Sequence, residues 1–141
     1  MRVLALDIGE RRIGIAFGDT RTGIASPLVV LPAEEVTSNA RTFRRVLEDY
    51  VPVVLDAGRP LTLSGEEGPQ ATHIEQVARQ IAAAVGLPLE FQDERLSSRE
   101  AKRILREQGL NERTMRGRVD SVAASLFLEA WMNSDQAQRG E

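Results

Sequence analysis

The chain has 141 residues, 42% hydrophobic and 28% charged, which suits one globular domain with a buried core and excludes an intrinsically disordered chain. It contains no cysteine, which excludes disulfides and thiolate metal sites, and no apolar run approaches the ~20 residues that span a bilayer. The net charge of −3 alone argues against a nucleic-acid partner, but the charge is distributed unevenly. We expect one domain over residues 1–134, a polar tail over residues 135–141 and a cytoplasmic location.

Three strands joined by short turns are predicted at the start of the chain. Residues 2–8 predict a strand that, after Arg2, is apolar on both faces except at Asp7, as in a central strand. Residues 13–17 and 24–31 predict the second and third strands, and Pro27 favours an edge position for the third. Two short turns between three strands predict an antiparallel meander.

Helical and strand-like segments alternate after the meander. Apolar residues three or four positions apart indicate helices, and short apolar runs between turn residues indicate strands. These patterns predict helices over residues 36–50, 69–85, 97–107 and from Val119 onward, and strands over residues 53–55 and 87–91. This order predicts an α/β fold with a mixed sheet and helices on its faces.

Asp7 is an ionisable residue in an otherwise apolar strand. An ionised carboxylate there is costly unless it is paired or binds a metal ion. Gly9 follows, so Asp7 lies near the end of the strand, where its carboxylate could also accept N–H bonds from the turn. The strand alone favours neither interpretation over the other.

Two further acidic positions lie at the ends of predicted elements. Asp93 and Glu94 follow the fifth strand, and sites in open sheets form at the carboxyl ends of strands. Taken alone, they are better explained as loop acids paired with Arg95. Asp120 opens the last helix, where the helix dipole favours an acid, and small residues such as Ala123 would let that helix approach the sheet closely.

Three carboxylates at element ends could together hold one or two divalent cations. Mg²⁺ or Mn²⁺ prefers oxygen ligands. Two such ions about 3.5–4 Å apart stabilise the attacking and leaving oxygens in phosphodiester hydrolysis. His73, the only histidine, is interpreted as a surface residue of a helix.

Basic residues flank two of these acidic positions. Residues 95–118 contain eight basic and three acidic residues, a net +5, which leaves −8 for the rest of the chain. A solvated helix face commonly explains such a run, but its position beside the acids favours a phosphate partner. The eight are Arg95, Arg99, Lys102, Arg103, Arg106, Arg113, Arg116 and Arg118.

Four motifs cover nearly the whole chain: DIGERRIGIA at residues 7–16, GRPL with GEEGP within 58–69, DERLSS at 93–98 and VDSVAA at 119–124. In order and spacing they resemble the motifs of the YqgF/RuvX family of Holliday junction resolvases. The resemblance implies a ribonuclease H-like fold, with a five-stranded sheet of three antiparallel and then two parallel strands. It also implies nuclease activity that depends on Mg²⁺ or Mn²⁺.

The resemblance also implies roles for individual residues. Catalytic roles fall on Asp7, Asp120 and the Asp93–Glu94 pair, in which we favour Glu94 as the third metal ligand, with Asp93 assisting. Arg12, Arg59 and the basic residues of the 95–118 segment would position the nucleic-acid backbone, which provides affinity without sequence recognition.

Resolution of Holliday junction DNA is the expected function, with 5′ maturation of the small-subunit ribosomal RNA precursor as the alternative. Symmetrical cleavage of a four-way junction needs two active sites, so a homodimer is expected. A non-catalytic nucleic-acid-binding module and a purely structural partner protein stay open. An ATPase related to sugar kinases and actin is a weaker alternative, because such proteins use two domains of this fold.

Three residues depart from the family pattern, and the first, Gly18 where the family usually has serine, barely affects the acids. Asp56 ends what should be an apolar fourth strand, and it is either a fourth acid near the site or a strained or paired carboxylate. Arg59 is atypical of the central loop and could add a phosphate contact.

Overall fold

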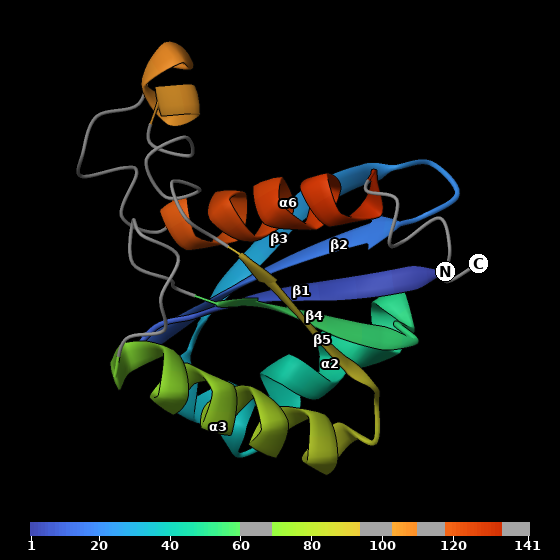
Figure 1. Ribbon diagram of the computed structural model, residues 1–141, viewed down its shortest axis with the longest axis vertical. Helices are drawn as coiled ribbons and strands as arrows, with labels where there is room; N and C mark the ends of the chain where they lie inside the picture. Colours follow the sequence, from blue (N-terminus) through green and yellow to red (C-terminus); the bar gives the residue numbers. More distant parts are fainter. Residues whose placement is uncertain (60–68, 94–102, 110–117, 134–141) are drawn as a thin grey trace.

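The computed structural model describes residues 1–59, 69–93, 103–109 and 118–133. Their strands form one five-stranded sheet in the order β3-β2-β1-β4-β5 (Figure 1). The strands are β1 (Arg2–Ile8), β2 (Arg12–Asp19), β3 (Ile24–Pro32), β4 (Val54–Arg59) and β5 (Leu89–Asp93). The β1–β2 and β2–β3 pairs are antiparallel, whereas the β1–β4 and β4–β5 pairs are parallel. The predicted mixed sheet, with β3 at an edge, is confirmed.

Helices cover both faces of this sheet (Figure 1). One face packs against α6 (Val119–Met132), and the other against α1 (Ala33–Thr37), α2 (Arg41–Tyr50) and α3 (Pro69–Val85). Alternate residues of β1 enter the two cores: Val3 packs with the α6 residue Phe127, and Leu4 with the α2 residue Phe43. Within the described residues, no helix combines the length and apolar character needed to span a membrane.

Some predicted boundaries differ from the structure. The helix predicted over residues 36–50 is two helices, because Asn39 adopts a left-handed φ of 54° and ends the first one. The fourth strand does not end at Leu55 but continues to Arg59, because its pairing with β5 continues beyond that residue. Asp56 was predicted to end the strand and Arg59 to lie in a loop, but both are residues of β4. The fifth strand is shifted by two residues and includes Asp93.

Val51 closes α2 in a left-handed conformation, with φ 48° and ψ 58°. A β-branched side chain is strained there, and Val51 is 53% exposed, so it gains little from burial. We expect Val51→Gly to raise the free energy of unfolding by about 0.5–1 kcal/mol, net of the larger backbone entropy of glycine. Thermal unfolding followed by circular dichroism measures this. Val53 is similarly exposed and has no positive φ, so Val53→Gly is the control and should not raise the melting temperature. A lower melting temperature for Val51→Gly than for the parent would contradict the proposed strain at Val51.

Candidate functional site

Asp7 and Asp120 meet at one end of the sheet through a glycine. Asp7 is half-buried near the end of β1 and pairs in register with Gly14 of β2. Residues directly opposite in an antiparallel pair project to the same face. A Cβ atom at Gly14 would collide with the backbone carbonyl of Asp120 and would lie 2.5 Å from the nitrogen of Ser121. The first turn of α6 therefore rests on the backbone of β2, on the face to which Asp7 projects.

Asp120 is half-buried in the first turn of α6. Burial raises the pKa of Asp120 above its usual value, and the nearby Arg12 guanidinium opposes that shift. The hydroxyl of Ser121 donates a hydrogen bond of 3.0 Å to the carbonyl of Arg118, which fixes the start of the helix. A carboxylate in this position would gain from a bound cation, because a cation offsets the cost of burying its charge.

The sheet surface next to Asp7 is formed by backbone. The register of β1 and β4 pairs Leu6 with Ala57 and so places Gly58 beside Asp7. Gly58 in turn pairs with Gln92 of β5. Asp7, Gly58 and Gln92 thus form one row across three strands, and the middle position carries no side chain.

The donor set suits a hard cation, since Asp7 and Asp120 supply two carboxylates on one face and at one end of the sheet. They contain no group of three or more histidine, aspartate or glutamate side chains that could hold a metal ion by themselves. The third predicted ligand, Glu94, lies outside the described residues. Asp93 is the last residue of β5 and pairs in register with Arg59.

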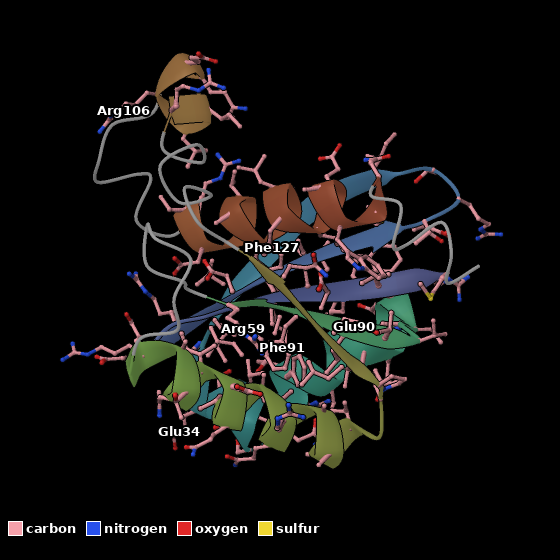
Figure 2. The ribbon with its side chains drawn as sticks, viewed as in Figure 1. Glu34, Arg59, Glu90, Phe91, Arg106 and Phe127 are labelled. Carbon is pink, nitrogen blue, oxygen red and sulfur yellow. The ribbon has the colours of Figure 1, made fainter. Side chains whose placement is uncertain are left out.

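Several predicted basic residues lie at this end of the molecule. Arg12 and Arg118 are exposed beside the start of α6. Leu105 is buried in a cluster with Val122 of α6, and this contact ties the segment 103–109 to the same helix turn. Arg103 and Arg106 (Figure 2) of that segment are exposed. Arg103 forms a 2.6 Å ion pair with Glu107. The predicted residues Arg95, Arg99, Lys102, Arg113 and Arg116 lie outside the described residues.

Arg59 lies on the other face of the sheet. Its guanidinium stands 4.8 Å from the centre of the Phe91 ring (Figure 2). It also lies 3.7 Å from Oε1 of Glu75 in α3. Arg79 contacts the same ring at 5.6 Å. The structure thus brings Asp7, Asp120 and Arg12 together and places Arg59 across the sheet from them.

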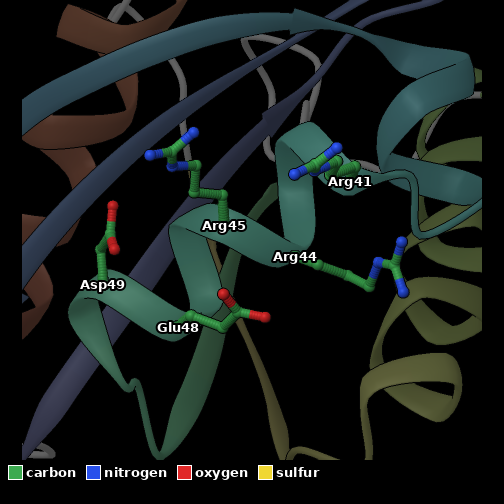
Figure 3. Close-up of a pocket in the computed structure, with 5 residues that line it drawn as sticks. All are labelled: Arg41, Arg44, Arg45, Glu48 and Asp49. Carbon is green, nitrogen blue, oxygen red and sulfur yellow. The ribbon is translucent and has the colours of Figure 1, made fainter.

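Two hollows lie near basic or polar residues that the sequence analysis did not assign to the site. The larger, of about 620 Å³, lies over α2, on the face opposite α6, and mixes both charges (Figure 3). Its lining residues are Arg41, Arg44, Arg45, Glu48 and Asp49. The spacing of Arg41, Arg44 and Arg45, which places all three on one side of a helix, could have indicated this basic surface from the sequence. The smaller, of about 430 Å³, adjoins Gly9 at the end of β1 and is lined by His73, which is exposed as predicted.

Comparisons with known proteins agree on one family and one fold. The model of the RuvX family, described as Holliday junction resolvase, matches residues 1–134. A relative from Roseiflexus sp. (strain RS-1) is 36% identical over 96% of both chains. One from Acaryochloris marina (strain MBIC 11017) is 39% identical over 92% of this chain and 90% of its own. Both relatives are named "Putative pre-16S rRNA nuclease".

Two solved structures share the fold at low sequence identity. RuvC of Thermus thermophilus, in complex with a Holliday junction substrate, matches with a TM-score of 0.58 and 14% identity, over 99% of this chain and 96% of its own. The fowlpox virus resolvase, in complex with Holliday junction DNA, matches with a TM-score of 0.57 and 13% identity, over 95% of this chain and 100% of its own. The predicted ribonuclease H-like fold is confirmed.

Proposed function

Because this chain belongs to the RuvX family of nucleases, we propose that it is a divalent-metal-dependent endonuclease that hydrolyses phosphodiester bonds of structured nucleic acid. The observation that carries this proposal is the position of Asp7 and Asp120 on one face and at one end of the sheet, joined through Gly14. Two acids from elements more than 100 residues apart in sequence meet there beside exposed arginines.

Asp7, Asp120 and Glu94 would hold the metal. Within the Asp93–Glu94 pair we favour Glu94 as the third ligand, as the resemblance to the family implies. Bound Mg²⁺ or Mn²⁺ would supply the positive charge that stabilises the attacking and leaving oxygens during hydrolysis.

Arginines around the acids would hold the substrate backbone. Arg12 acts on Asp120, Arg118 precedes the first turn of α6, and Arg103 and Arg106 continue the basic surface beyond that turn. Contacts of this kind bind phosphate oxygens without distinguishing bases. For Arg59 to contact a phosphate, the nucleic-acid backbone would have to reach the face of the sheet that α3 covers. The phosphate-binding role of Arg59 therefore stays a prediction.

The RNA precursor is the favoured substrate. Relatives 36–39% identical over nearly the whole chain carry the name of a pre-16S rRNA nuclease. Junction DNA is the second candidate, because it is the substrate in the description of the family. A homodimer is expected only if the substrate is a junction that is cleaved symmetrically. Analytical ultracentrifugation of the protein bound to a four-way DNA junction would measure how many chains bind.

Side-by-side cleavage assays test the proposal. A pre-16S ribosomal RNA fragment and a four-way DNA junction are incubated with Mg²⁺, with Mn²⁺ and with a chelator. We expect cleavage of the RNA with either metal ion and none with chelator. Cleavage of the junction alone would favour the second candidate. Chelator-insensitive binding of both substrates without cleavage would instead support a non-catalytic binding module.

A further inference from the structure

Asp56 places a carboxyl group in the buried interior of the sheet, where it is not expected to stabilise the fold. It lies in the middle of β4 with 0% of its surface exposed. Within the described residues, no hydrogen bond of standard length and angle reaches either carboxyl oxygen, and Gln92 is the hydrogen-bonding side chain that acts on the carboxyl group. An apolar residue would fill this position at lower free energy, because burying an unsatisfied polar group is costly. Such costs are typical of residues kept for a site rather than for stability.

The strand register shows which residues face this carboxyl. Asp56 pairs with Ala5 of β1 on one side and with Glu90 of β5 on the other, on the face covered by α6. Gln92 is the next residue of β5 on that face. Burial raises the pKa of Asp56 well above its usual value; the Gln92 side chain opposes this shift, and the charge of Glu90 adds to it.

Gln92 connects Asp56 to the site. It lies in the row of Asp7 and Gly58, one step along the sheet from Asp56, and it is two residues before Glu94. The side chain of Gln92 is half-buried, and it is near enough to Asp56 to oppose the rise in the pKa of that carboxyl group. The carboxyl end of β5 thus places a polar side chain next to the buried carboxyl group of β4, two residues before the predicted metal ligand.

We propose that Asp56 is a positioning residue for the nuclease reaction: its buried carboxyl group holds the Gln92 side chain and thereby fixes the carboxyl end of β5, the strand that Glu94 follows in the sequence. This inference rests on the proposed function. Asp56 acts through Gln92 and does not touch the reacting phosphate. When a residue that orients a metal ligand without binding the metal is substituted, activity typically falls by about 10–100-fold.

The opposite responses of stability and activity test this role. Asp56→Val removes a buried polar group from an apolar strand, so its melting temperature should rise by about 4 °C or more. Its cleavage rate at saturating substrate should fall about 10-fold or more, with little change in KM. Asp56→Asn keeps the size and a polar contact with Gln92, and it should restore most of the rate.

Val54→Ala is the matched control, because Val54 is buried on the same strand and the same face. It should lower the melting temperature and leave the cleavage rate unchanged. Gln92→Ala should slow cleavage as Asp56→Val does, and the double variant should be no slower than either single one. An Asp56→Val variant that cleaves at the parental rate, or that is less stable than the parent, overturns the proposal.

Hydrogen exchange gives a readout that needs no substrate. Backbone amides at the carboxyl end of β5 should exchange faster in Asp56→Val than in the parent, although the whole protein is more stable. If the parent cleaves neither nucleic acid, the proposed function fails, and the exchange rates still decide whether Asp56 fixes β5. Unchanged exchange in β5 overturns the positioning role.

Discussion

Asp7→Asn is expected to reduce the rate of nucleic-acid cleavage by about 1,000-fold. The substitution keeps the shape of the side chain and removes the negative charge that would attract the metal ion. Stabilisation of the transition-state charge by a metal is worth several kcal/mol, and every 1.36 kcal/mol changes a rate tenfold. Single-turnover cleavage with saturating Mg²⁺ measures the loss, and circular dichroism verifies that the variant is folded.

The acid Asp49 provides a matched control for this variant. It is exposed on α2, on the face of the sheet opposite Asp7. Asp49→Asn changes the net charge by the same amount and should leave cleavage unchanged. Cleavage by Asp7→Asn at the rate of the parent would exclude Asp7 as a metal ligand and would return its carboxylate to a purely structural role in the turn.

Gly14→Ala is the second substitution with a large expected effect. Its Cβ would overlap the backbone carbonyl of Asp120, and backbone atoms cannot move aside as a side-chain end can. The first turn of α6 must therefore shift away from β2. We expect the free energy of unfolding to fall by about 3 kcal/mol and cleavage to fall about 100-fold, because a displacement of about 1 Å misplaces Asp120.

Gly18→Ala separates this effect from a general intolerance of alanine in β2. Gly18 lies on the same strand and the same face, but a Cβ there would first meet Cε of Met132, at 2.6 Å, the flexible end of a side chain. That methyl group can move, so the loss of stability should be about 1 kcal/mol or less. Equal losses for the two variants, measured by urea unfolding, would contradict the close contact at Gly14.

The main features of the fold follow from local patterns in the sequence. A strand that is apolar on both faces predicts the central position of β1, and the charge on Asp7 within it is visible without a structure. The break between α1 and α2 is not, because it depends on the left-handed conformation of Asn39. The length of β4 was missed because Asp56 and Gly58 interrupt its apolar run, while pairing with β1 and β5 keeps these residues in the sheet.

Some residues of the candidate site could likewise be predicted from the sequence, and others could not. Its acids were predicted because charges at the ends of apolar elements are conspicuous in a sequence. Gly14 was not singled out, since its importance depends on a helix more than 100 residues away that packs on it. Arg59 was predicted to lie in a loop near phosphate, but as a strand residue it projects by parity to the α3 face, where Phe91 and Glu75 contact it.

The amino ends of β1 and β4 lie opposite the end that carries Asp7. Asp7 lies five positions beyond Arg2 along the strand, a distance of about 17 Å. Ile24, paired with Asp19 at that far end, is 63% exposed. Because the chain has no cysteine, Ile24→Cys would create a single reactive thiol. A molecule tethered to a glass surface through it would present its acids to solution, so that binding and cutting of one nucleic acid at a time could be watched.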